Sequence, residues 1–145
     1  PVAMNCPACQ AFLGGNYRSP GPYGGITPQS GLPSIKEALA TYGGIRLPNP
    51  RIIHVQLLLY NMEMNTPSMD DAKKWAAHFK IDSGDNEFLL VADQRFMGQA
   101  SYDMIPGFQL IDQQFILRAD STGHNPQHDL WRELIPLVRR ILNEQ

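Results

Sequence analysis

Cysteine and surplus charge are both scarce in this sequence. Two cysteines occur in 145 residues, too few for a secreted scaffold held together by several disulfides. The 12 Lys and Arg residues stand against 14 Asp and Glu, which gives a formal net charge of −2. Nucleic acids and anionic membranes attract proteins through a basic surplus that is missing here. We therefore expect no nucleic-acid partner.

Long apolar runs are missing too. A membrane-spanning helix needs roughly 20 mostly apolar residues, and no stretch approaches that length, so we expect no membrane span in the visible chain. The length of 145 residues suits one hydrophobic core, which predicts a single domain over residues 1–145 and a monomer. The first residue is Pro1 rather than Met, and no charged-then-apolar leader precedes the first predicted strand. We expect a processed or trimmed start, which leaves the compartment open.

Strand and helix patterns follow one another along the chain. Apolar runs and alternation predict strands at residues 1–4, 51–60, 87–93, 107–112 and 115–119. Caps and periodicity near 3.6 predict helices at residues 6–13, 34–42, from 66–68 onward, and 130–142, with a kink at Pro136. The run at 51–60 suits a central strand buried on both faces. The chain is therefore predicted to be α/β, with parallel and antiparallel pairing in one sheet flanked by helices.

Residues 16–33 have a different composition, rich in Gly, Pro, Ser and Tyr and without periodicity. Such a stretch predicts a long loop, and long loops in compact domains are functional or mobile. One hypothesis is that Tyr17 and Tyr23 cover the reactive cysteines or contact a substrate. The alternative is a disordered surface insertion.

The chemistry is expected at Cys6-Pro7-Ala8-Cys9, where two cysteines three positions apart begin a predicted helix. This spacing can close a small disulfide ring, and a helix start stabilises a thiolate on the first cysteine. Cys6 is therefore the predicted nucleophile, and Cys9, deeper along the helix, the residue that resolves a mixed disulfide. Pro7 removes a backbone donor near the Cys6 sulfur, which changes how the thiolate is stabilised.

Such a pair can also supply two of the four ligands of a zinc site, and two cysteines can simply be core residues. A zinc site would need two further ligands, for which the sequence offers His54, His78, His124 and His128. The last two have a spacing compatible with metal binding, although solvated loop histidines are common. We expect no metal and no cofactor.

The motif at Cys6 to Cys9, followed much later by the segment Met104-Ile105-Pro106-Gly107-Phe108-Gln109-Leu110-Ile111-Asp112, resembles the thioredoxin superfamily, especially its TlpA/ResA-like thiol-disulfide oxidoreductases. The resemblance implies a thioredoxin-like fold and dithiol/disulfide exchange. It also implies a cis bond before Pro106, a loop there that packs against the cysteines, and a substrate-binding surface made by Ile105, Pro106 and Pro7.

The implied partners are a protein or small-molecule disulfide substrate and a reductase or oxidase. The resemblance favours an extracytoplasmic or secretory-pathway location.

Some features depart from that family. Asn5 stands where its members usually have Trp, and the 16–33 loop interrupts the helix that follows the cysteines. A cysteine that replaces a natural selenocysteine is compatible with the sequence. Two alternatives remain. One is a thiol peroxidase of related fold, although the upstream Thr of peroxiredoxins is missing. The other is a metal-binding or redox-sensing module without enzymatic activity.

Overall fold

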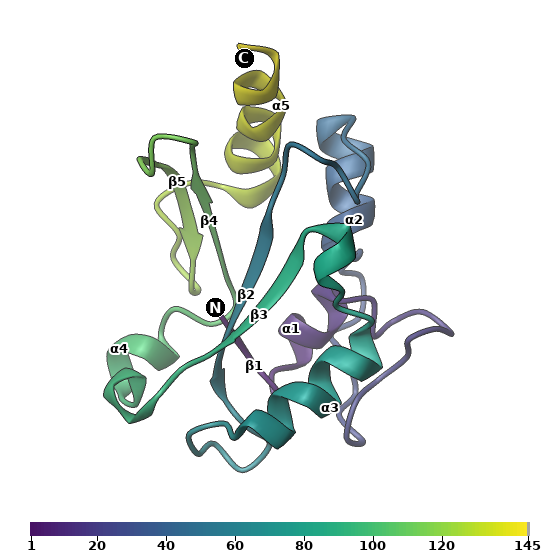
Figure 1. Cartoon of the computed structure of the whole chain (residues 1–145), viewed down its shortest axis with the longest axis vertical. Coiled ribbons are helices and arrows are strands. Elements are labelled where there is room, and N and C mark those ends of the chain that lie inside the picture. The colour runs from purple at the N-terminus through teal and green to yellow at the C-terminus, as the bar shows by residue number, and fades with distance from the viewer. Residues whose placement is uncertain (145) are drawn as a thin grey trace.

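A computed structural model of the chain describes residues 1–144 (Figure 1). Three parallel strands form one sheet in the order β1-β2-β3, with bounds Val2–Ala3, His54–Tyr60 and Glu87–Val91. A second sheet is an antiparallel hairpin of β4, Gly107–Ile111, and β5, Leu117–Thr122. The predicted α/β class, strand positions and hairpin are confirmed.

The prediction of one mixed sheet is wrong in one respect, because the two kinds of pairing lie in separate sheets. The two-residue β1 is too short to join them by a full ladder. A backbone hydrogen bond links them where the Gly107 N–H donates to the Pro1 carbonyl at 3.3 Å. The hairpin thus contacts the parallel sheet through this bond beside β1, and the rest of β4 is not paired with that sheet.

Among residues 1–144, five α-helices lie between and after the strands. They are α1 Pro7–Phe12, α2 Ile35–Ala38, α3 Met69–Phe79, α4 Gln99–Tyr102 and α5 Ile135–Asn143. Ser68 begins α3 with a capping box, since its side chain accepts the Asp71 N–H while the Asp71 carboxylate accepts the Ser68 N–H. Ser34 caps α2, which runs on through a π-helical turn to the left-handed Gly44.

The three helices α1, α2 and α3 lie on one side of the parallel sheet (Figure 1). Strand order explains this, because right-handed crossovers between successive parallel strands place every connecting helix on the same face. On that face, Leu58 of β2 packs with Trp75 of α3, and both are fully buried. On the other face, Val55 and Leu90 are 48% and 54% exposed. The expectation that β2 is buried on both faces is therefore wrong at Val55 but holds at the end of the strand, where Leu59, on the same face as Val55, is 2% exposed.

The C-terminal helix joins the hairpin to the first two helices. Ile135 and Val138 of α5 pack with Phe12 and Ala38, and the hairpin's Phe108 lies against the same cluster. A π-helical segment, Leu130–Leu134, runs directly into α5, and Pro136 lies in the first turn of α5. The change from π-helical to α-helical hydrogen bonding thus falls next to Pro136, and the kink expected there stays a prediction.

Within residues 1–144, no helix combines the length and the apolar character needed to cross a membrane.

Candidate redox site

The two cysteines stand at the junction of β1 and α1. Cys6 is the N-cap, with extended backbone angles (φ −86°, ψ 114°), and Pro7 follows at the first helical position. The turn is short because the Cys6 N–H donates back to the Ala3 carbonyl at 3.3 Å. Cys6 and Cys9 form a disulfide whose Cα atoms are 5.2 Å apart. The structure therefore places the predicted reactive pair at one helix start.

The two sulfurs differ in their access to solvent. Cys9 is 1% exposed, whereas Cys6 is only half-buried. The Cys9 N–H also donates to the Cys6 sulfur at 3.0 Å. A donor in this place stabilises negative charge on the sulfur when the disulfide is opened. The geometry thus gives Cys6 the attributes of an attacking thiolate and Cys9 those of an internal partner.

The loop at Ile105 lies against these cysteines. The bond between Ile105 and Pro106 is cis, as predicted. Ile105 is buried in a small cluster with Ala3 and Cys9, and Cys6 packs at its edge. The Ile105 N–H donates to the Tyr102 carbonyl at 3.1 Å, so any pairing of this residue with a substrate would use its carbonyl.

No protein-family model matches this chain, and no significant match was found among curated proteins or solved structures. The site is therefore interpreted from its own geometry.

Gln10 belongs to the site although its sequence context did not single it out. Its side chain is fully buried and donates to the carbonyls of Met4, at 2.8 Å, and Tyr23, at 3.1 Å. Its oxygen accepts the Tyr23 N–H at 2.8 Å. The only sequence signal was a polar residue beside Ala11 and Phe12 in an otherwise apolar helix. Gln10 thus links β1, α1 and the 16–33 loop.

The 16–33 loop is attached to the protein at further points. The Gln29 N–H donates to the carbonyl of Pro7, inside the CPAC motif, at 3.1 Å. Gly15 packs so closely that an added Cβ would lie 2.8 Å from the Gln10 carbonyl oxygen and 2.9 Å from Pro28. These contacts contradict the alternative of a disordered insertion.

The tyrosines of the loop contact helices. The Tyr23 ring meets the edges of Trp75 and His78 on α3, with centroids 5.4 and 5.2 Å away. The Tyr17 hydroxyl is hydrogen-bonded to Glu37 of α2 and accepts the Ser34 N–H. The Tyr17 hydroxyl and the Tyr23 ring thus hold the loop on α2 and α3 and not over the cysteines. The other part of the hypothesis, that these tyrosines contact a substrate, stays a prediction.

The four histidines do not gather around the cysteines. The ring of His78 is hydrogen-bonded to the Gly21 carbonyl at 3.0 Å, and His128 accepts the Asp120 N–H at 3.2 Å. Across residues 1–144, no group of three or more His, Cys, Asp or Glu side chains is placed to hold a metal ion.

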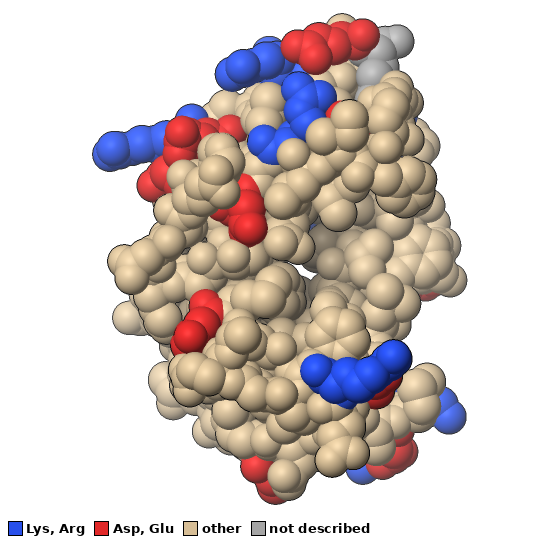
Figure 2. Space-filling view, turned by 90° about the vertical axis from the view of Figure 1, so that its left-hand side faces the viewer, with Lys and Arg blue, Asp and Glu red and all other residues tan. Residues whose placement is uncertain are grey.

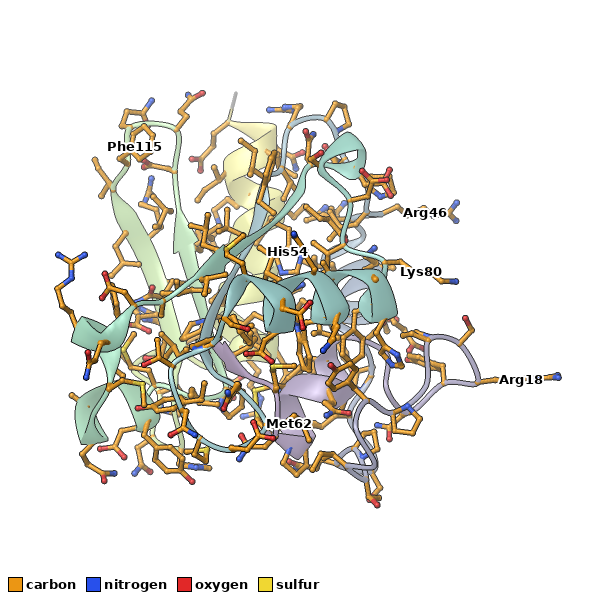
Figure 3. All side chains as sticks on the ribbon, turned by 60° about the horizontal axis from the view of Figure 1, so that its bottom comes forward. Arg18, Arg46, His54, Met62, Lys80 and Phe115 are labelled. Atoms are coloured by element: carbon orange, nitrogen blue, oxygen red, sulfur yellow. A yellow bond between two sulfur atoms is a disulfide. The ribbon has the colours of Figure 1, made fainter. Side chains whose placement is uncertain are left out.

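His54 lies between the sheet and the helices and is partly buried, whereas Arg18, Arg46 and Lys80 point outward (Figure 3). Its Nδ1 is buried without a hydrogen-bond partner. Burial lowers the pKa of His54, since the charged ring would lose its hydration, and nearby Glu87 opposes this only in part. Glu87 is itself paired with Lys36 at 2.7 Å. His54 is thus a partly buried, neutral residue and not part of the redox site.

Proposed function

We propose that this protein is a thiol-disulfide oxidoreductase with a thioredoxin-like fold, which acts through the Cys6 and Cys9 pair. The observation that supports this most is the asymmetry of the two sulfurs. Cys6 is reachable and accepts the Cys9 N–H at 3.0 Å, while Cys9 is 1% exposed directly behind it. A pair of structural core cysteines would have no reason to leave one sulfur accessible at a helix start.

The reaction follows from that arrangement. In the reduced protein, the Cys6 thiolate attacks one sulfur of a substrate disulfide, and the other substrate sulfur leaves as a thiolate. The Cys9 thiolate then attacks the Cys6 sulfur of this mixed disulfide and releases the second substrate thiolate. Two electrons pass to the substrate, and the Cys6 to Cys9 disulfide forms. The same steps run in reverse oxidise a substrate dithiol.

The proposed likeness in fold is supported by the surroundings of the pair. The strand before the cysteines lies between β2 on one side and the start of β4 on the other, and the loop before β4 packs against Cys9 through Ile105. We propose that a disulfide substrate docks beside Pro7, Ile105 and Pro106, where it can donate a hydrogen bond to the Ile105 carbonyl.

The test is covalent trapping. The Cys9→Ser variant keeps the attacking Cys6 sulfur but lacks the sulfur that would release the bound substrate. It should therefore accumulate a mixed disulfide when it is incubated with glutathione disulfide or with insulin. Cys6→Ser should trap far less, because the remaining sulfur is buried. Ala8→Ser, inside the same motif, serves as the matched control and should turn over normally. Equal trapping by both cysteine variants would contradict the proposal. So would the absence of any trapped mixed disulfide together with rapid peroxide consumption by the unaltered protein.

The reduction potential then separates the two directions of electron flow. A value near that of thioredoxin, roughly −270 mV, would indicate a reductase, and one nearer −120 mV an oxidase.

A further inference from the structure

The helix-covered face of the parallel sheet is apolar in its middle and polar at one end. Side chains alternate between the two faces along a strand, so His54, Gln56 and Leu58 of β2 all lie on this face. Leu58 packs with side chains of α3, whereas His54 stands at the start of β2 beside its register partner Glu87 of β3. Glu87 is only 4% exposed. Carboxylates are almost never buried to this extent unless they are paired, so the partners of Glu87 determine what this end of the face can do.

Two polar atoms at this end of the face lack a hydrogen bond to any described residue. His54 Nδ1 and Glu87 Oε1 are both buried, and neither has a hydrogen-bond partner. The Lys36 ammonium of α2 lies 2.7 Å from Glu87 Oε1 and offsets its charge, but its direction does not meet the geometry of a hydrogen bond. Unpaired buried atoms of this kind destabilise a fold unless something takes the place of the missing partner.

A hollow of about 230 Å³ adjoins these atoms. The sheet contributes His54, Gln56 and Glu87 to its lining, and the exposed residues Ser19 and Lys80 lie at its rim, joined by a hydrogen bond from the ammonium to the hydroxyl at 3.3 Å. Its apolar walls come from α1, α2 and α3 and the residues that follow them, namely Phe12, Leu13, Ile35, Phe79 and Ile81. Neither cysteine lines this hollow, which adjoins the end of α1 opposite to the redox site.

The charges around the hollow disfavour ions of either sign. An anion would lie against the Glu87 carboxylate and a cation against the Lys36 ammonium, and these two groups are 2.7 Å apart. Burial lowers the pKa of His54, so its ring adds no charge at neutral pH. A carboxylate only accepts hydrogen bonds. An uncharged molecule with one donor therefore avoids both repulsions and supplies what Glu87 Oε1 lacks.

We propose that this hollow binds a small uncharged molecule that has a hydroxyl or N–H donor on a ring-sized apolar body. The donor would meet Glu87 Oε1, with His54 Nδ1 beside it as a second hydrogen-bonding atom, and the ring would pack against Phe12 and Phe79. An engineered apolar cavity of about 150 Å³ in another protein binds benzene, so a hollow of about 230 Å³ has room for a ring with a substituent. Apolar walls with a few convergent polar groups are the usual composition of small-molecule sites.

A second, larger hollow provides an internal comparison. It has a volume of about 940 Å³, lies on the open side of the sheet, and has Val55, Leu90 and Ile141 among its walls. Figure 2 shows an opening near the middle of a largely uncharged face. A ligand that is bound by apolar contact alone would enter this larger space as readily as the small one. Only a ligand that is directed by its donor should prefer the hollow at Glu87.

Phenol and toluene test the proposal on the unaltered chain with its disulfide intact. The two molecules have nearly the same size and shape, but toluene has no donor. Binding would be followed by NMR at the amides of Glu87 and Phe79, and at Ile141 for the larger hollow. We expect phenol to shift the first two amides saturably and to leave Ile141 unchanged. Its dissociation constant at this hollow should be at least about tenfold lower than that of toluene, which is the effect of a hydrogen bond to a charged group.

Two variants identify the acceptor. Glu87→Met keeps an unbranched side chain but removes the carboxylate, so phenol should lose its advantage over toluene. Lys80→Met, the matched control, removes a charge at the rim and should leave phenol binding unchanged. No saturable shift of Glu87 by millimolar phenol, equal affinity for the two ligands, or shifts centred on Ile141 would each overturn the proposal. These outcomes are measured on the unaltered chain, so they hold even if a variant fails to fold, and none depends on the redox activity of Cys6.

Discussion

The two faces of the parallel sheet carry similar residues but have different surroundings. On the face toward α1, α2 and α3, Leu58 is completely buried, while on the opposite face Val55 and Leu90 are about half exposed, at 48% and 54%. All three lie in strands rich in Val, Ile and Leu. The difference therefore comes from the strand order, which sends each crossover helix to the same side. Apolar character identifies a strand, but topology decides which face is covered.

The largest loss of unfolding free energy is expected from a side-chain truncation on the helix-covered face of the sheet. Trp75→Ala removes a fully buried ring that packs with Leu58 and Phe79, and such truncations cost about 3–5 kcal/mol. Leu90→Ala on the open face should cost less than about 1 kcal/mol, because the side chain is already half in water. Urea unfolding followed by circular dichroism measures both. Equal losses would mean that the two faces are buried alike in solution.

A smaller loss is expected when a buried amide is removed. Gln10→Ala leaves the carbonyls of Met4 and Tyr23 and the N–H of Tyr23 without their partner, which should cost about 1–3 kcal/mol in unfolding free energy. The matched control is Gln109→Ala on the open side, where the side chain is exposed and the change should be near zero. A neutral Gln10→Ala would show that the loop is not held through this residue.

The next prediction concerns how the unfolding free energy depends on pH through His54. The pKa of His54 lies below its usual 6.5 in the folded protein because the ring is buried, so the unfolded chain takes up the proton first as pH falls. The contribution of the neutral ring is therefore complete above about pH 6.5 and is lost progressively as pH drops toward the folded pKa.

His54→Gln should flatten this part of the stability profile, which urea titrations between pH 7 and 5 would measure. Comparison with the unaltered chain at each pH isolates His54 from the Pro1 amine, whose lowered pKa acts in the same direction. An unchanged slope in the variant would place the pH dependence elsewhere.

The smallest expected effect is on the open face. Leu90→Lys places a charge where the side chain already meets water, so the unfolding free energy should change by no more than about 0.5 kcal/mol. Because exposed apolar patches promote association, the variant should also remain soluble at higher concentration. A large destabilisation would mean that something covers Leu90 in solution.

The parts of the structure that could be predicted are those encoded by short local patterns. Pro7 after a cysteine, the Ser34 cap and the turn at Asp112 each depend on neighbours a few residues away, and all three are found. The cis bond at Pro106 was expected from the resemblance to a known family, whereas the cis bonds before Pro20 and Pro48 were not predicted.

What could not be predicted depends on residues distant in the sequence. Gln10 looks like a surface residue until the Tyr23 backbone folds back onto it. The open face could not be foreseen either. It follows from the path of the crossovers, which the sequence of β2 alone does not contain.

The attachment of the 16–33 loop bears on how the reactive motif could be moved into another protein. The Pro7 carbonyl accepts the Gln29 N–H, and the Gln10 side chain donates to the Tyr23 carbonyl, so the surroundings of the CPAC motif are built partly from the loop itself. A graft of residues 1–13 alone would leave the buried Gln10 amide without its two hydrogen bonds to the Tyr23 backbone. A transplant of residues 1–33, together with a helix that offers the ring contacts of Trp75, is the smallest unit that keeps this motif intact.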